Sequence, residues 1–317
     1  MSSYKLCETA TEANFTEETY LLANPDIKQA VKKGDFKSGR EHFEMYGKAE
    51  GRCVRLPMDV IADAKVSKLK KLEPLLRDDM PYILPEGYLY NFLGEDLRAK
   101  FNIVATDAVS SNNYGHEVLQ LIEKYEEVWI LDCGAGRRDM YYDNVVNLEI
   151  VDYDTTDVLG VGEKLPFRDN VFDAVLSLSV LEHVKDPFLC AREIARVLKP
   201  GGTLICSVPF LQPYHGYPHH YYNMTSQGVE NLFANHLEID KVKVGEAELP
   251  IWSLTWILQS WVNGLVGEAR ESFLEMRIGD LLESGDKYLD WRFVKELSPE
   301  KNLELAYATL LFAHKKN

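Results

Sequence analysis

The sequence predicts an α/β protein with a mostly parallel sheet that helices cover on both faces. Short apolar runs alternate with helical patterns through residues 128–208, as parallel strands joined by helical crossovers require. The first run ends abruptly in a glycine-rich turn, which is typical of the carboxyl end of a buried strand. The chain has 317 residues and is 46% hydrophobic, enough for one large domain with an appendage. Ligands of such folds bind beyond the carboxyl ends of the strands.

The glycine-rich turn, residues 132–136, has features that narrow the class of ligand. Gly134 and Gly136 lack a Cβ and adopt positive φ readily, so the backbone there can approach a ligand closely. A nicotinamide-binding turn would need a third glycine where Asp139 stands. Asp132, two residues before the first glycine, would repel a pyrophosphate but suits a cationic ligand. The turn therefore predicts a positively charged ligand without phosphate.

Charge and cysteine usage narrow the class of partners. The formal net charge of -15 argues against nucleic acid as the main partner, since neutralising phosphates requires a basic face. The lysine-rich run at residues 65–71 is interpreted as one solvated helix face. The five cysteines form no Cys-x-x-Cys pair, which indicates reduced thiols in a cytoplasmic protein. With no signal peptide and no apolar run of about 18 residues, we expect a soluble protein without a transmembrane segment.

Residues 1–56 are expected to form a separate small helical module with three short helices. The caps and stops that predict these helices are, in order, Thr16, Asn24 with Pro25, Gly34, Ser38 with Glu41, and Gly47. Residues 57–110 are interpreted as a connector with one charged helix at about 59–78. The connector's aromatic side chains are expected to pack between domains, or else to cover the mouth of the ligand site: Tyr82, Tyr88, Tyr90 and Phe92.

The main domain is assigned to residues 111–317. A helix starting at Asn112 or Asn113 is expected to lead into the first strand, and its predicted buried stripe is Val118, Leu119, Leu121 and Ile122. Later strands are predicted at residues 144–150, 157–161, 171–177, 203–208 and about 237–244. Helices are predicted from Asp186 with Pro187 onward and at about 226–233.

A helical insertion is predicted at about 249–300, before a final strand at about 304–314. Its first helix contains Trp252, Trp256 and Trp261. We assign this aromatic stripe to core or dimer packing, so a homo-oligomer is one expectation. A lid over the acceptor, or peripheral contact with a membrane surface, is the alternative.

Five motifs in order resemble the class I S-adenosylmethionine-dependent methyltransferases over the middle third of the chain. They are Asp132-x-Gly134-x-Gly136, Leu165-Pro166-Phe167, Phe172-Asp173-Ala174-Val175, Leu181-Glu182-His183-Val184 and Arg196-Val197-Leu198-Lys199-Pro200-Gly201-Gly202. The resemblance implies a Rossmann-like, doubly wound, mostly parallel seven-stranded sheet whose last strand is antiparallel. It also implies transfer of a methyl group from S-adenosylmethionine.

The resemblance assigns cofactor-binding positions to the carboxyl ends of four strands. In this family the second strand carries an acid that accepts both ribose hydroxyls, and Glu149 is our choice, with Asp152 as the alternative. Relatives usually place an aspartate for the adenine where Val161 stands, so a backbone group of Gly162 or the side chain of Glu163 is expected to replace it. The complete set is Asp132, Cys133, Gly134, Ala135, Gly136, Glu149, Ile150, Gly162, Glu163, Ser177 and Leu178.

The loop at residues 212–223 follows the fifth predicted strand and is rich in histidine, proline and tyrosine. In this fold it faces the acceptor, so we predict that it carries the general base. His219 is favoured, then His215, while Tyr221 or Tyr222 would orient the acceptor. His183 and His220 are further candidates, each with a structural role as the simpler interpretation. No metal is predicted, because the loop contains no Asp or Glu and its spacing matches no familiar ligand pattern.

The acceptor is the least constrained part of the prediction. The sequence pattern of residues 20–52 resembles a short module found beside bacterial glycosyltransferases and polysaccharide-biosynthesis enzymes. This resemblance favours a glycan or glycan precursor as the methyl acceptor. A small-molecule acceptor methylated on nitrogen, carbon or oxygen is an alternative. A non-catalytic cofactor-binding subunit of a polysaccharide assembly complex is another.

Overall fold

A six-stranded sheet forms the centre of the protein. The computed structural model describes residues 2–106, 109–110, 113–125, 128–216 and 218–306. The strand order is β10-β9-β5-β7-β8-β4, and every neighbouring pair is parallel. The strands are β4 (Tyr90–Asn91), β5 (Ile130–Cys133), β7 (Val145–Glu149), β8 (Val158–Leu159), β9 (Phe172–Leu178) and β10 (Leu198–Ser207). The predicted mostly parallel α/β sheet is therefore confirmed, but the described residues give it six strands rather than the seven expected, and one of the six, β4, was not predicted.

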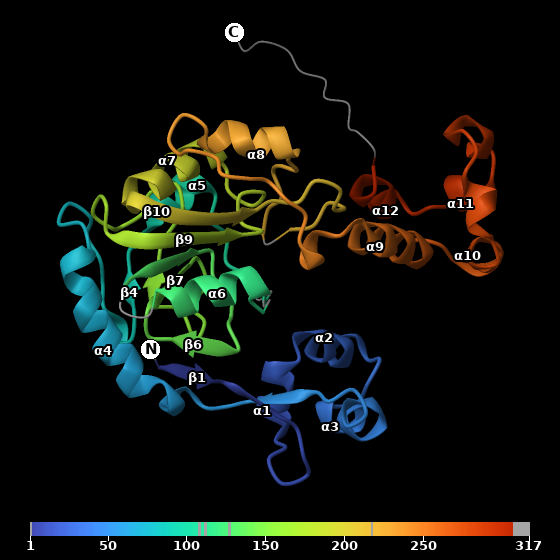
Figure 1. Cartoon of the computed structure of the whole chain (residues 1–317). Coiled ribbons are helices and arrows are strands. Elements are labelled where there is room, and N and C mark those ends of the chain that lie inside the picture. Colours follow the sequence, from blue (N-terminus) through green and yellow to red (C-terminus); the bar gives the residue numbers. More distant parts are fainter. Residues whose placement is uncertain (1, 107–108, 111–112, 126–127, 217, 307–317) are drawn as a thin grey trace.

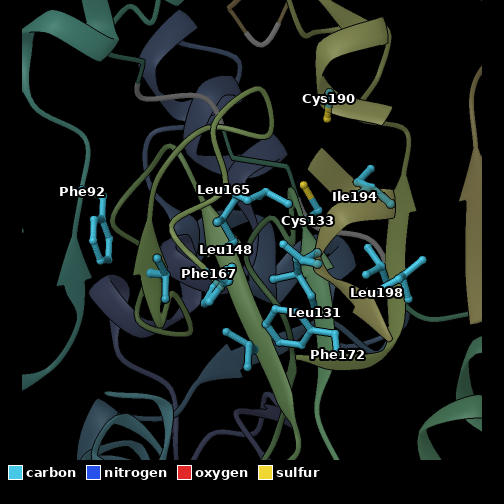
Figure 2. Packing of buried hydrophobic residues seen from close by; sticks show 14 of the residues in the cluster. Phe92, Leu131, Cys133, Leu148, Leu165, Phe167, Phe172, Cys190, Ile194 and Leu198 are labelled. Atoms are coloured by element: carbon cyan, nitrogen blue, oxygen red, sulfur yellow. The ribbon is translucent and has the colours of Figure 1, made fainter. Parts of the chain in front are cut away.

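Alternate residues of the strands enter two separate cores. Leu131 and Cys133 of β5 pack with residues of α7 (Pro187–Val197) and α8 (Ser226–Phe233). Ile130, the residue before Leu131, packs on the other face against α6 (His116–Lys124). This period of two is what a sheet covered on both faces requires. Figure 1 shows the helices on the two sides, and Figure 2 shows Leu131 and Cys133 in the first core.

The helices of the main domain begin and end close to the predicted residues. The Asp186 carboxylate accepts a hydrogen bond from the amide of Leu189 at 2.9 Å, which caps α7 as predicted. Helix α8 spans Ser226–Phe233 as predicted. Helix α6 starts at His116, and three of its four predicted stripe residues are buried. The fourth, Leu119, is 37% exposed, so its assignment to the core was wrong.

The connection between β5 and β7 contains no helix. Residues 134–144 form the glycine turn and a short strand, β6 (Met140–Tyr142). Parallel neighbours usually need a crossover of a dozen or more residues, most often a helix, to cover the sheet. Here β6 pairs in an antiparallel manner with β1 (Ser3–Lys5), so the amino-terminal segment of the chain lies against this connection.

The module at residues 1–56 has the three predicted helices, α1 (Glu17–Ala23), α2 (Pro25–Lys33) and α3 (Gly39–His42), and, besides β1, two further strands. These strands, β2 (Cys7–Thr9) and β3 (Cys53–Arg55), pair with each other. The Thr16 side chain caps α1 as predicted. Asn24 does not cap α2, because its amide group donates to the carbonyls of Tyr20 and Cys53 instead. A π-helical turn, Phe43–Gly47, extends α3.

The connector contributes to the main domain. It contains α4 (Ala62–Leu72) and α5 (Glu95–Phe101) in addition to the edge strand β4. Tyr90 and Phe92 are buried in the main core. The interpretation of the lysine run as a solvated face was wrong for Lys65 and Lys68, which are 1% and 2% exposed. Both ammonium groups donate to groups of the sheet domain, Lys65 to a carbonyl and Lys68 to the buried Asp157 carboxylate at 3.0 Å.

The carboxy-terminal part differs most from the prediction. No strand forms at residues 237–244, although all of them are described. The helical insertion is present as α9 (Pro250–Asn263), α10 (Gly267–Leu274), α11 (Arg292–Lys295) and α12 (Pro299–Glu304), which extend away from the sheet (Figure 1). Trp261 packs in the insertion's own small core, whereas Trp252 is 61% exposed. Residues 307–314, which carry most of the predicted final strand, lie outside the described residues. Among the described residues, no helix is long and apolar enough to cross a membrane.

Candidate functional site

The glycine turn lies against two other segments of the chain. Gly134 has φ of 85°, and a Cβ there would lie 2.5 Å from a methyl carbon of Val180. Gly136 has φ of 64°, and a Cβ there would lie 2.8 Å from the carbonyl oxygen of Ser110. Side chains are excluded at both positions by conformation and by space. The turn is thus a backbone surface bounded by the segment after β9 and by the segment before α6.

Glu149, at the carboxyl end of β7, lies directly beside this turn. One carboxylate oxygen accepts the amide of Gly136 at 2.8 Å, and the other accepts the amide of Ile150 at 2.7 Å. Burial raises the pKa of this carboxyl, and the two amides act against that shift. The structure therefore brings the predicted ribose-binding acid to the glycine turn, whereas Asp152 is exposed.

Asp132 has its cationic partner within the chain. The Arg138 guanidinium donates to one Asp132 oxygen at 2.7 Å, and both side chains are buried. The hydroxyl of Tyr114 donates to the same oxygen at 2.5 Å, and its ring lies under the guanidinium. Burial acts to lower the pKa of Arg138, but the Asp132 carboxylate outweighs it and raises the pKa above its usual range. The sequence-based inference that Asp132 would bind a cationic ligand overlooked Arg138 as its partner. With Arg138 and Tyr114 bound to one oxygen, only the second Asp132 oxygen has no partner among the described residues.

The remaining predicted cofactor residues lie at the same end of the sheet. Gly162 faces the sulfur atoms of Cys133 and Cys190, which are shown in Figure 2. The Glu163 carboxylate is buried and accepts the amide of Lys185 at 3.0 Å, so it supports the start of α7 in this structure. Ala135, Ser177 and Leu178 lie at the ends of the two central strands.

The histidine-rich loop is held by the turn that follows β9. The amide of Tyr221 donates to the carbonyl of Glu182 at 2.6 Å. His183 donates through Nδ1 to the carbonyl of His219 at 2.5 Å. Since Val180, two residues before Glu182, touches the glycine turn, the loop lies near that turn.

The predicted catalytic side chains separate into two groups. His219 Nε2 lies 2.9 Å from the side-chain amide nitrogen and 3.0 Å from the carbonyl oxygen of Asn102. The same amide donates to the Tyr221 hydroxyl at 3.1 Å. Asn102 has φ of 60° at the end of α5, and sequence reasoning gave it no role.

His215 belongs to the second group, with Glu182 and His183. Its ring centroid is 5.1 Å from that of His183 and 5.3 Å from that of Trp256. Burial raises the pKa of the Glu182 carboxyl to about 8. Burial also lowers the pKa of His183 to about 4 and lowers that of His215. Both imidazoles are therefore neutral near pH 7.

The segment that contains these groups matches a known family. Residues 107–206, about a third of the chain, match the sequence profile of the family described as "Methyltransferase domain". They include the glycine turn, Glu149 and the Glu182–His183 turn. The chain contains a methyltransferase domain. The domain is of the class I, S-adenosylmethionine-dependent type, in agreement with the resemblance of its five motifs.

Curated proteins match short stretches of this chain. An uncharacterised methyltransferase of Schizosaccharomyces pombe is 44% identical over 63 residues, 20% of this chain and 23% of that protein. A ubiquinone/menaquinone biosynthesis C-methyltransferase of Chromobacterium violaceum is 37% identical over 87 residues, 26% of this chain and 33% of that protein. The chain thus spans a third or less of the length of these relatives. Phosphoethanolamine N-methyltransferase 2 of Haemonchus contortus, solved with S-adenosylmethionine, is 17% identical with a TM-score of 0.31 and covers 56% of this chain and 51% of that one.

The residues of the methyltransferase domain fit the cofactor that the family implies, S-adenosylmethionine. The backbone surface at Gly134 and Gly136 would face the charged part of the cofactor, and Glu149 would accept its ribose hydroxyls. The second Asp132 oxygen, buried and without a partner among the described residues, is an acceptor that an ammonium group would satisfy. When bound, S-adenosylmethionine supplies a methyl group activated by a sulfonium.

We predict that Glu149→Gln weakens S-adenosylmethionine binding at least about tenfold, since hydrogen bonds to a charged group contribute about 1.5–3 kcal/mol each. Asp152→Asn is the matched comparison, because Asp152 is the alternative acid in the same segment and is exposed. Titration calorimetry on both variants measures the difference. If only Asp152→Asn lost affinity for S-adenosylmethionine, Asp152 rather than Glu149 would be the acid that binds the ribose.

Proposed function

We propose that the protein is an S-adenosylmethionine-dependent methyltransferase that acts on a hydroxyl oxygen of a glycan or glycan precursor. The observation that carries this proposal is the position of the histidine-rich loop. It is hydrogen-bonded to the turn after β9, and that turn touches the cofactor-binding glycines. Proton-accepting side chains are thus held at the end of the sheet to which we assign the cofactor.

The reaction forms a bond between the acceptor oxygen and the methyl carbon while the bond from that carbon to sulfur breaks. The sulfonium becomes a neutral thioether, and the hydroxyl proton passes to a base on the protein. An alcohol is a poor nucleophile until this proton leaves, and a placed base typically supplies about 10²–10⁴-fold. His219 is the proposed base, with His215 as the alternative, and Tyr221 orients the acceptor. Asn102, which contacts both His219 and Tyr221, is the residue that positions them.

A pocket beside the loop supports an anionic, ring-bearing acceptor such as a nucleotide sugar. The pocket is lined by Lys100, Phe101, Lys185, Asp186, Pro187, Phe188, Leu189 and Tyr222. Two lysines favour a phosphate-bearing ligand, and exposed aromatic rings such as Phe188 can stack on a sugar. The resemblance of residues 20–52 to a module found beside glycosyltransferases favours the same acceptor class.

Screening with labelled S-adenosylmethionine tests this function. Nucleotide sugars, glycolipids and small phenols are offered separately, and label transferred to the first two supports the proposal. Transfer only to phenols or amines would favour small-molecule biosynthesis. Tight cofactor binding without transfer to any acceptor would favour a non-catalytic cofactor-binding subunit.

We predict that His219→Ala lowers turnover by about 10²–10⁴-fold while S-adenosylmethionine affinity stays nearly unchanged, because the ring faces Asn102 rather than the glycine turn. Initial rates and calorimetry on the same preparation separate the two quantities. His236→Ala, a change at a histidine beyond α8, serves as the control and should leave both unaltered. Unchanged turnover in His219→Ala would show that His219 is not the base.

A further inference from the structure

Three side chains from two distant segments converge at the acceptor side of the site. Glu182 and His183 follow β9, and His215 belongs to the loop after β10. One ligand atom from each of the three lies within 4.8 Å of the other two. His183 Nε2 and a Glu182 carboxylate oxygen are 3.7 Å apart. Ligands of one tetrahedral metal ion, each at about 2.0–2.2 Å from it, are about 3.3–3.6 Å apart, so the three side chains would have to move together only slightly to bind one ion.

The Glu182 carboxylate lacks a compensating group. The residue is 0% exposed, and neither carboxylate oxygen has a hydrogen-bond partner among the residues that the structure describes. Burying a carboxylate without hydrogen bonds or a countercharge is costly, and buried charges are usually paired or bound to a metal. In its ionised form the side chain would therefore be stabilised by a positively charged ligand.

Hydrogen bonds fix the tautomers of the two histidines. His183 donates through Nδ1 to the His219 carbonyl at 2.5 Å, and His215 donates through Nδ1 to the Pro213 carbonyl at 2.9 Å. A carbonyl oxygen can only accept, so each Nδ1 carries the proton and each Nε2 carries the lone pair. A ring held by an Nδ1–carbonyl bond is the usual support for a metal-binding imidazole.

His220, the last histidine of the loop, has the opposite arrangement. Its Nδ1 accepts the amide of His215 at 3.1 Å, and its Nε2 donates to the side-chain oxygen of Asn223 at 2.7 Å. Both nitrogens are used within the loop, so His220 anchors the loop and supplies no ligand.

We propose that Glu182, His183 and His215 bind one divalent first-row cation such as Zn²⁺ or Mn²⁺. Two neutral imidazoles and one carboxylate suit these ions and leave coordination positions open. This inference rests on the proposed function and deepens it: the acceptor hydroxyl occupies an open position. Coordination lowers the pKa of that hydroxyl, so its proton leaves to His219 or water before the oxygen attacks the methyl carbon. The carboxylate, which the loop itself does not contain, comes from a turn about 30 residues earlier.

Calorimetry with ZnCl₂ and MnCl₂ on the chelator-treated, tag-free full chain tests the site. We expect one ion per chain for the wild type and a loss of affinity of at least about tenfold in both Glu182→Gln and His215→Ala. His219→Ala is the matched control from the same loop and should bind the ion like the wild type, since its ring faces Asn102. Circular dichroism confirms that each variant is folded. Absence of binding to the wild type, or wild-type affinity in both folded ligand variants, would overturn the proposal.

The metal result and the enzymatic result can be distinguished. Stoichiometric binding that depends on Glu182 and His215 would establish the site even if no acceptor in the screen were methylated. If an acceptor is found, chelator treatment should lower turnover at least about tenfold and added Zn²⁺ or Mn²⁺ should restore it. Turnover that a chelator leaves unchanged would overturn the role at the acceptor.

Discussion

Replacing Gly134 by valine is expected to reduce S-adenosylmethionine affinity at least about 30-fold. A side chain at φ of 85° costs about 1–2 kcal/mol. The added Cβ would lie 2.5 Å from Val180, and crowding of this kind costs about 1–3 kcal/mol. If the turn shifts to relieve both, cofactor binding must restore its geometry at a total cost of about 2–5 kcal/mol, and each 1.4 kcal/mol is tenfold. Titration calorimetry on the folded variant measures the loss.

Gly201→Val is the matched control for this prediction. Gly201 has φ of 76°, but nothing lies within 4 Å of the Cβ position. The backbone strain is therefore similar, whereas the crowding at the cofactor turn is absent. We expect Gly201→Val to lower stability and leave cofactor affinity nearly unchanged. Equal affinities for the two variants would contradict the assignment of the cofactor to the Gly134 turn.

The central strands were predictable because they are apolar runs that end in glycine, proline or an acid. β5, β7 and β9 begin and end within two residues of the predicted positions. The edge strand β4 was missed, since Tyr90–Asn91 is too short to show a period and follows a proline-rich stretch. Its place in the sheet is set by pairing with β8, which is a tertiary contact.

The amino-terminal segment could not be placed from its sequence. Caps predicted the helices of residues 1–56, but β1 and β3 are three residues long and depend on distant partners. Arg55 shows the consequence: its guanidinium is buried between Asp139 and Asp154 of the main domain. Asp139, noted only for replacing a glycine, is thus a docking point for the module. The charge pattern of a segment does not show which of its charges will be buried.

The candidate site was predictable in its cofactor half and less so in its acceptor half. The glycine turn and Glu149 follow from a motif whose residues are close in sequence. The group of Glu182, His183 and His215 joins two strand ends that are adjacent in the sheet but distant in sequence. Reading the loop alone, without a carboxylate, led to the expectation of no metal. The topology supplies that carboxylate, because β9 and β10 are parallel neighbours and their carboxyl ends meet.

Replacing Arg138 by methionine is expected to lower the free energy of unfolding by about 3–5 kcal/mol, because it leaves the Asp132 carboxylate buried without its countercharge. Asp132 is 0% exposed, and among the described residues only Tyr114 would remain as its hydrogen-bond donor. Denaturation by urea, followed by circular dichroism, measures the change. The double variant Arg138→Met/Asp132→Leu should recover part of the lost stability, since it also removes the carboxylate that the single change leaves buried without a countercharge.

Arg168→Met provides the comparison, because Arg168 pairs with Asp78 at a similar distance of 2.7 Å but with both side chains exposed. An exposed pair contributes about 0–1 kcal/mol, so this variant should differ little from the wild type. A comparable loss in the two arginine variants would mean that burial does not set the strength of the Asp132 pair. In that case Asp132 could tolerate an unpaired charge, and the first expectation, that it awaits a cation from the ligand, would become the better account of this acid.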